Sequence, residues 1–310
     1  MQHISSKDST GRRKPEADIF GREDIQQDTQ EFFNYIMDAL HDETNIHRDQ
    51  SEKPYEVEDN DARSLLYHSI RYWHKYTTQN QSIVTKYWRG METGITICRR
   101  CKNRSVTPQT SDLTSLAIGA GHLVGSLEHY IRNETIDDYP CSGLCKKNGW
   151  GPSQVDRRIY LSRMPDRLTF RIHRGIVTPA GYLAKNKSRF TFPFQNLDVE
   201  PYFIPKDERG IDRTDAEVAQ TADTERQFRP PLKYDCYAVI CHIGDSLRSG
   251  HYIAYVRDTD SADPTDWIKF DDANVTHVKV GSNAPNDEAE KLFGRGRQQA
   301  YMLFYQRQGS

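Results

Sequence analysis

The chain has 310 residues, in which 42 Lys and Arg nearly balance 44 Asp and Glu. This balance provides no basic surplus that would indicate nucleic acid or anionic lipid as a partner. The sequence shows no signal-peptide pattern and no apolar run of about 18 residues, so we expect an intracellular protein, cytoplasmic or nuclear, that binds neither nucleic acid nor a membrane.

The N-terminal part of the sequence predicts a polar tail followed by helices. Residues 1–20 are polar and predict a disordered tail. From Asp24 to Leu40 apolar residues recur at helical spacing, with Asp24 as the N-cap and Gln27 three residues later, which predicts a helix over 24–42. An acidic loop separates it from a second helical pattern at 65–76.

Beyond Ser82 the pattern is mainly that of β-strands. Apolar residues alternate or cluster in short segments, which predicts strands at 95–98, 168–172, 237–241, 251–256, 267–270 and 301–305. Residues 206–231 are polar and charged, with little to bury, and predict an insertion loop with room for a short helix. The fold class expected from this order is α+β, with a β-rich second half.

Four of the six cysteines form two closely spaced pairs, Cys98 with Cys101 and Cys141 with Cys145. Two short hooks of this kind can aim four thiolates at one tetrahedral zinc, so we predict a structural Zn²⁺ site. The alternatives are four buried or free thiols, or a redox Cys-x-x-Cys, which here lacks a βαβ context.

A histidine and a carboxylate occur on neighbouring predicted strands. His251 begins the segment HYIAYVR, and Asp271 with Asp272 ends WIKFDD. Across a hairpin such residues can meet as a general base and the acid that orients it, although a histidine near an aspartate is often purely structural. Gly250, directly before the histidine, would let a substrate backbone come close, which favours the functional interpretation.

Taken together, these segments resemble the ubiquitin-specific proteases. Residues 26–33, QQDTQEFF, resemble the glutamine box of that family, and 250–257 with 267–275 resemble its histidine box. The two cysteine pairs resemble the zinc site of its fingers. The resemblance extends from about Phe20 to Gln306.

The resemblance implies a papain-like cysteine protease fold with a helical thumb, a β-rich palm and zinc-ribbon fingers. The corresponding domain would be 21–307, with the remaining thumb helices at 21–80, the fingers at 81–165 and the palm with its histidine box at 166–307. Its implied reaction is the thiol-dependent hydrolysis of the isopeptide bond after the C-terminal glycine of ubiquitin. Ubiquitin and ubiquitinated proteins are the implied partners.

The resemblance also implies roles for individual residues. His251 would be the general base, Asp271 the acid that orients it, and Asp272 an adjacent acid that assists at the oxyanion. His242 matches a second family histidine and is not the predicted base. Contacts with the extended ubiquitin tail are expected from Gln27, Asp28, Gln30, Glu31, Gly250 and Tyr252. For Asp28 the alternative is a solvated acid favoured by the helix dipole.

The family box that carries the nucleophilic cysteine and an oxyanion asparagine has no match in this sequence, because no cysteine precedes residue 26. Cys236 and Cys241 lie on or beside predicted strands, whereas a thiolate nucleophile is favoured at a helix N-terminus. We therefore expect the chain as given to be inactive alone, as a deubiquitinase truncated at its N-terminus. The alternatives are a ubiquitin-binding pseudoenzyme and a zinc-ribbon nucleic-acid binder, the latter disfavoured by the lack of a basic stripe.

Overall fold

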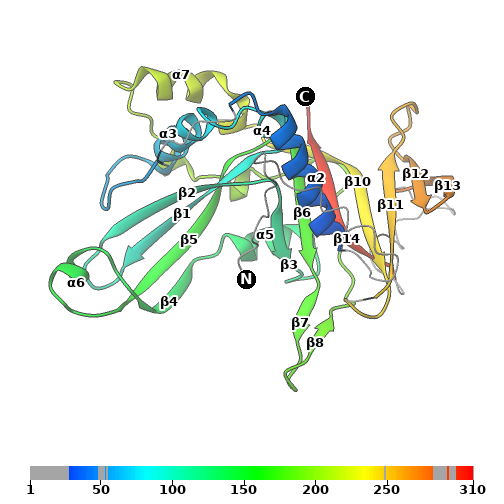
Figure 1. Ribbon diagram of the computed structural model, residues 1–310, viewed down its shortest axis with the longest axis horizontal. Coiled ribbons are helices and arrows are strands. Elements are labelled where there is room, and N and C mark those ends of the chain that lie inside the picture. The colour runs from blue at the N-terminus through cyan, green and yellow to red at the C-terminus, as the bar shows by residue number, and fades with distance from the viewer. Residues whose placement is uncertain are drawn as a thin grey trace, which may run out of the picture.

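The computed structural model of the protein describes residues 28–47, 53, 55–247, 249–281, 292 and 298–309. Within this part, a four-stranded sheet and an eight-stranded sheet lie next to each other, with helices packed on and between them (Figure 1). The predicted α+β class is confirmed. No helix of the described residues is long and apolar enough to cross a membrane.

The four-stranded sheet has the order β2-β1-β5-β4 and is antiparallel throughout. Its strands are β1 (Gly90–Cys98), β2 (Arg104–Ser111), β4 (Glu134–Tyr139) and β5 (Ser153–Arg163). The short helix α6 (Leu144–Lys147) lies at the end of this sheet that is far from the larger one (Figure 1). One cysteine pair lies at the turn of the β1–β2 hairpin and the other between β4 and β5. The pairing of these strands in one sheet brings the two cysteine pairs together.

The eight-stranded sheet follows the order β13-β12-β11-β10-β14-β6-β3, and β9 pairs with β10. Large side chains, among them Phe170, Tyr255 and Tyr305, are fully buried against it and form the main core. All six predicted strand segments lie within observed strands. The bounds in this sheet are β3 (Thr114–Ala117), β6 (Arg167–His173), β9 (Leu197–Asp198), β10 (Lys233–Ile243), β11 (His251–Arg257), β12 (Asp266–Asp271), β13 (Asn274–Lys279) and β14 (Gln298–Arg307).

A two-stranded hairpin of β7 (Gly175–Val177) and β8 (Leu183–Lys185) projects from the body of the molecule (Figure 1). The hairpin follows directly after β6, and Lys185 at its base contacts His242 and Gly244 at the end of β10. Much of the hairpin is exposed, including Val177 of β7 and Leu183 of β8, whereas Lys185 at its base is buried.

Helix α2 (Thr29–Thr44) begins and ends later than predicted. Its N-cap is Asp28, whose carboxylate accepts a hydrogen bond from the backbone N–H of Gln30 at 2.7 Å. The expected cap, Asp24, and its partner Gln27 lie outside the described residues. The predicted second helix is confirmed as α3 (Leu65–Thr77), and α4 (Ile83–Tyr87) and α5 (Leu123–Tyr130) complete this group.

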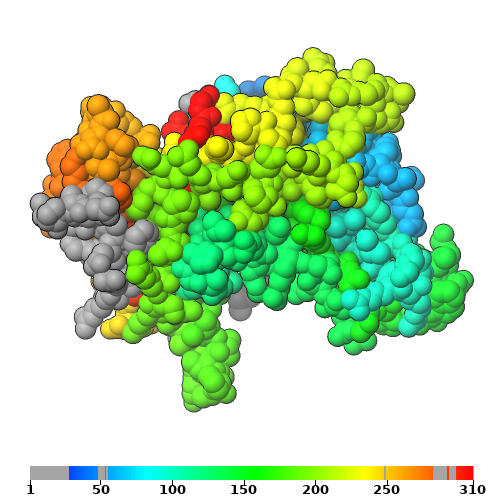
Figure 2. Space-filling model, turned by 180° about the vertical axis from the view of Figure 1, so that it is seen from behind, coloured from blue at the N-terminus to red at the C-terminus, as the bar shows by residue number. Residues whose placement is uncertain are grey.

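The polar stretch 206–231 is more ordered than its composition predicts. It contains α7 (Ala216–Thr224), and Val218 and Phe228 are almost fully buried. In the opposite view of Figure 2 the same segment spreads along one edge of the molecule. The stretch also contains two short 3-10 turns, η2 (Lys206–Glu208) and η3 (Arg226–Phe228), and a third, η1 (Glu200–Tyr202), precedes it.

Side-chain hydrogen bonds dock α7 on α3. Tyr67 donates to Asp215 at 3.0 Å, and His74 bonds Thr221 at 2.7 Å. The expectation that this stretch has little to bury was therefore wrong, because Val218 of α7 and Phe228 of η3 both join the main core and seat the stretch on it.

The outer face of α2 carries an apolar stripe. Phe32, Ile36 and Leu40 are spaced by one helical turn and are 46%, 38% and 37% exposed. The adjacent face is turned toward the protein, with Met37 only 4% exposed and Phe33 packed against Phe304 of β14 at 5.9 Å between ring centroids. The helix thus packs on the larger sheet and leaves one apolar edge open to solvent.

Two neighbouring substitutions on α2 should therefore act in opposite ways. Ile36→Glu is expected to reduce self-association in light scattering, with a free energy of unfolding that changes by less than about 0.5 kcal/mol. Met37→Glu buries a carboxylate and is expected to lower the free energy of unfolding by about 3 kcal/mol or more. Similar losses in denaturant unfolding for both variants would contradict this orientation of α2.

Candidate functional site

His251 and Asp271 meet at the end of the β11–β12 hairpin. His251 is the first residue of β11, and Asp271 is the last residue of β12. The antiparallel pairing of Ala254 with Phe270 brings the two ends together, and Nε2 of His251 lies 2.7 Å from Oδ1 of Asp271. Both side chains are partly exposed, at 39% and 31%. The pair is held on rigid strands and is open to a reacting group.

The contacts of Asp271 determine which imidazole nitrogen can act as a base. A carboxylate only accepts hydrogen bonds, so Nε2 of His251 carries the proton and Nδ1 carries the lone pair when the ring is neutral. Lys269 lies 3.3 Å from Oδ2 of Asp271. The hydrogen bond from His251 and the ammonium of Lys269 keep the pKa of Asp271 below its usual value, despite some desolvation. Asp271 therefore stays ionised and can stabilise an imidazolium.

Asp272 occupies a different place from its neighbour. It lies in the turn between β12 and β13, in the left-handed region with φ 51°. Its Oδ2 is 3.9 Å from Nε2 of His251, and its side chain is 82% exposed. Asp271 is thus the hydrogen-bonded partner of the histidine, and the oxyanion role of Asp272 stays a prediction.

Packing inside the protein requires a glycine at position 250, which the sequence did not show. A Cβ atom built at this position would lie 2.1 Å from the carbonyl oxygen of Ile243 and 2.6 Å from Nε2 of His242. The protein's own strand β10 therefore fills the space that was expected for a substrate backbone. The predicted contact between Gly250 and substrate stays a prediction, but packing against β10 already requires the glycine.

Asp28 connects α2 to the larger sheet. Tyr301 of β14 donates its hydroxyl to the two carboxylate oxygens of Asp28 at 3.0 and 2.9 Å. Arg171 of β6 donates to the same hydroxyl at 3.3 Å. Burial, followed by the Asp28 charge, raises the pKa of Tyr301. Asp28 is therefore neither a merely solvated acid nor only a helix cap, because it also anchors the helix.

Tyr252 belongs to the same cluster. Its ring lies 5.8 Å from that of Tyr301 and 4.7 Å from that of His242, and it is half-buried. Burial and the nearby Asp28 raise its pKa. The structure thus brings Asp28, Tyr252 and the end of β10 together, beside the strand that begins with His251.

The other predicted tail-binding residues of α2 are more scattered. Gln30 lines an open groove between α2 and the loop at 111–113, together with Asn34 and Asp38 from successive turns of the helix. Glu31 is exposed to solvent, and Gln27 lies outside the described residues. The groove gives Gln30 a place from which to contact an extended peptide.

The four paired cysteines form one compact cluster. Their Sγ atoms all lie within 4.8 Å of one another, with Cys98 and Cys145 at 3.7 Å and Cys101 and Cys141 at 3.5 Å. A tetrahedral zinc with Zn–S bonds of about 2.3 Å requires sulfur atoms about 3.8 Å apart. The separations are far longer than a disulfide bond, of about 2.05 Å. The donor set and its spacing therefore fit a tetrahedral soft-ligand ion.

The surroundings of the cluster support the same interpretation. Apart from three of the cysteines, Val155 is the only member of this small core that is fully buried among the described residues. Burial and hydrogen bonds shared with the other sulfur atoms raise the pKa of Cys145 to about 12. Four thiols held this closely cannot all ionise unless a cation neutralises them. A bound metal would stabilise this end of the sheet, where few apolar side chains are buried.

The remaining two cysteines are unsuited to be nucleophiles. Cys236 and Cys241 lie on β10 and are 1% and 0% exposed. Burial raises the pKa of both thiols, that of Cys241 to about 12. All six cysteines of the chain are among the described residues, and each of them either belongs to the four-cysteine cluster or is buried on β10.

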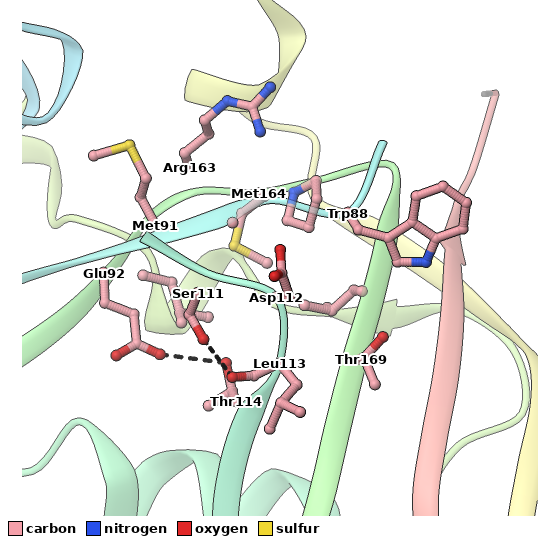
Figure 3. Close-up of a pocket in the computed structure, with 14 residues that line it drawn as sticks. Trp88, Met91, Glu92, Ser111, Asp112, Leu113, Thr114, Arg163, Met164 and Thr169 are labelled. Carbon is pink, nitrogen blue, oxygen red and sulfur yellow. Dashed lines mark hydrogen bonds between the residues drawn. The ribbon is translucent and has the colours of Figure 1, made fainter. Parts of the chain in front are cut away.

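A small, partly open cavity lies elsewhere, between the two sheets (Figure 3). Glu92 at its edge accepts hydrogen bonds from Tyr130 at 2.6 Å and from Thr114 at 3.3 Å. Its volume of about 20 Å³ suits a single water molecule, and neither histidine nor cysteine is among its lining residues. It is a packing feature and not the reaction site.

The sequence did not predict three residues that contact the candidate site. They are Lys269, Tyr301 and Lys185, which contact Asp271, Asp28 and His242 respectively. Only Lys269 has a signal in the sequence, since its position two residues before Asp271 places both side chains on one face of β12. The other two act across large separations in the chain, where no local pattern predicts a contact.

Comparison with known proteins now identifies the family. The model of the ubiquitin carboxyl-terminal hydrolase family matches residues 12–305. The chain belongs to this family, which confirms the resemblance to ubiquitin-specific proteases.

Curated relatives agree with this assignment. Ubiquitin carboxyl-terminal hydrolase 4 of Saccharomyces cerevisiae (strain YJM789) is 28% identical over 283 residues, which cover 86% of this chain and 28% of the relative. Ubiquitin carboxyl-terminal hydrolase 48 of Danio rerio is 26% identical over 247 residues, covering 74% and 21%. The chain thus spans less than a third of these relatives.

Solved structures share the fold. The SAGA Ubp8/Sgf11/Sus1/Sgf73 DUB module bound to ubiquitin aldehyde matches with a TM-score of 0.58 and 19% identity, over 92% of this chain and 50% of that one. A structure of the same module bound to monoubiquitin matches with a TM-score of 0.59. The papain-like fold expected for a ubiquitin-specific protease is confirmed.

Proposed function

We propose that the chain is the ubiquitin-binding and general-base part of a deubiquitinating cysteine protease. The observation that carries this proposal is the 2.7 Å contact between His251 and the ionised Asp271, open to solvent on rigid strands. In a complete site Nδ1 of His251 would accept the proton of a cysteine thiol, and the thiolate would attack the carbonyl of the last glycine of ubiquitin. The imidazolium would return the proton to the leaving amine, and water would then hydrolyse the thioester.

The nucleophile is the part of this mechanism that the six cysteines of the chain do not supply. Four of them are within 4.8 Å of one another, and two are deeply buried on β10. We therefore propose that these 310 residues bind ubiquitin without cleaving it, and that hydrolysis requires a cysteine from outside them. A pseudoenzyme that only holds ubiquitin is the second candidate, favoured by the same placement of the cysteines.

Substrate recognition is proposed to involve the groove between α2 and the loop at 111–113. Gln30, Asn34 and Asp38 line its helical side, and the exposed Glu31 lies nearby. These polar and acidic groups suit the arginine and the backbone amides of the extended ubiquitin tail. Zinc at Cys98, Cys101, Cys141 and Cys145 would hold the end of the four-stranded sheet, a structural role that leaves the reaction to His251.

Calorimetric titration of the chain with ubiquitin tests this function. We expect saturable binding that is lost when ubiquitin lacks its C-terminal Leu-Arg-Gly-Gly. Glu31→Lys should weaken binding about tenfold or more, because it places a cation opposite the arginine of the tail. Glu217→Lys, the same charge reversal at an exposed position of α7, serves as the control with little effect.

Two results would count against the proposal. Absence of saturable ubiquitin binding would reject the chain as a ubiquitin-binding unit. Turnover of a ubiquitin C-terminal fluorogenic substrate that a thiol alkylator abolishes would show that a nucleophile is present after all.

A further inference from the structure

Lys185 is a buried lysine at the base of the β7–β8 hairpin. It is only 8% exposed, and its ammonium group has three acceptors in one short segment. Nζ lies 2.6 Å from Nδ1 of His242, 2.9 Å from the carbonyl oxygen of Gly244 and 3.4 Å from that of His242. These acceptors end β10 and begin the loop that leads through Gly250 to His251. A single side chain thus ties the hairpin to the segment before the candidate base.

The surroundings of Lys185 disfavour its positive charge. The described residues place no carboxylate within ion-pair distance of it, and Arg174, 1% exposed, lies nearby. Burial, followed by the charges of Arg174 and Lys187, lowers the pKa of Lys185 to about 8, while Asp245 opposes them. Its contacts with the three acceptors are what offset this desolvation.

The contact with Nδ1 determines the proton position on His242. An ammonium has donors and no acceptor, so Nδ1 of His242 must accept, and the ring proton must be on Nε2. Burial, and then the charge of Lys185, lower the pKa of His242 to about 4, so the ring stays neutral. The groups that face this ring are Lys185, Arg174, His251, Asp28, Tyr252 and Tyr301.

The protonated nitrogen of His242 faces the start of β11. A Cβ atom at Gly250 would lie 2.6 Å from Nε2, which shows how closely this nitrogen approaches the backbone before His251. The strand pairing of His242 with Tyr252 fixes the ring on this side. The Nε2–H of His242 is thus a hydrogen-bond donor beside the candidate base, and its presence depends on the contact of Lys185 with Nδ1 of the same ring.

We propose that Lys185 is a positioning residue, which holds His242 as the neutral Nε2–H tautomer and fastens the hairpin to the loop that presents Gly250 and His251. Its consequence for ubiquitin rests on the proposed function, because Gly250 and Tyr252, two of the residues predicted to contact the ubiquitin tail, adjoin this ring. The tautomer itself is independent of any ligand.

Nitrogen-15 spectra of the histidine side chains test the positioning directly. In the 310-residue chain at pH 7 we expect His242 as the pure Nε2–H tautomer, with its signals assigned by their loss in His242→Gln. Lys185→Met should give a mixture of tautomers and shift the His251 signals, and Lys185→Arg, which keeps a charged donor, should restore much of the native pattern. Lys187→Met is the matched control, because Lys187 pairs with Asp245 of the same loop at 2.7 Å but is exposed.

The outcomes separate this proposal from the proposed function. His242 in the Nδ1–H form in the unmodified chain would overturn the proposal, and this measurement stands even where Lys185→Met fails to fold. Unchanged His242 signals in a folded Lys185→Met would overturn it as well. Ubiquitin affinity about tenfold weaker for Lys185→Met than for Lys187→Met is expected, and equal affinities would refute the link to the tail. Absence of ubiquitin binding by the unmodified chain would reject the proposed function alone.

Discussion

Replacing Cys145 by serine is expected to release a bound zinc and to unfold the far end of the four-stranded sheet. The four sulfur atoms lie within 4.8 Å of one another, and Val155 is the only other fully buried member of that small core among the described residues. In zinc-finger peptides the metal contributes about 10–16 kcal/mol of apparent binding free energy, which becomes folding free energy. We expect local loss of more than about 3 kcal/mol at this end of the sheet.

Metal analysis and hydrogen exchange measure this effect. The purified chain should contain about one zinc, and Cys145→Ser well under one. Amides of β4, of the C-terminal end of β1 and of the N-terminal end of β5 should lose protection from exchange. Those of β10 and β14 should keep it, because the cysteine cluster and the larger sheet have separate cores. Cys241→Ala is the control, since it removes a buried thiol outside the cluster and should retain the metal. A wild-type chain without zinc would refute the metal site.

Gly250→Ala should be among the most destabilising single-methyl changes in the chain. The added carbon would lie 2.1 Å from the carbonyl oxygen of Ile243, a backbone atom held by pairing with His251. Because neither strand can withdraw without breaking this pairing, we expect a loss of about 3 kcal/mol or more in the free energy of unfolding. Ubiquitin binding should weaken too, since the displaced segment carries His251.

Denaturant unfolding of two alanine variants tests this packing. A Cβ at Gly210 would meet nothing within 4 Å, so Gly210→Ala should change the free energy of unfolding by less than about 0.5 kcal/mol. Equal midpoints for the two variants would show that the approach of β10 to Gly250 is looser than the structure places it.

The elements that the sequence predicted well depend on contacts that are close in the chain. His251 and Asp271 are 20 residues apart, on strands that pair directly, so alternation and spacing were enough to predict that they meet. Each cysteine pair likewise belongs to one short turn. The start of α2 was predicted too early, because Asp24 and Asp28 both have capping side chains and local pattern alone does not choose between them.

The features that the sequence did not reveal depend on distant or non-repetitive contacts. Asp28 and Tyr301 are 273 residues apart, and Lys185 and His242 are 57 apart. The burial of Val218 and Phe228 in a charged stretch is of the same kind, since their apolar partners lie in other elements. No periodicity signals such contacts, because they arise only after the sheets have assembled.

By itself, the sequence determined the family, the α+β class, the residues of the histidine and aspartate pair and the four cysteines, because motif spacing and strand alternation are local properties. Only the tertiary structure decided how closely β10 packs against the segment before the histidine, and therefore that the residue there must be a glycine. It alone also placed the ammonium group of the buried Lys185 against Nδ1 of His242. Each of these depends on how closely two segments approach, which side-chain packing sets and no linear pattern encodes.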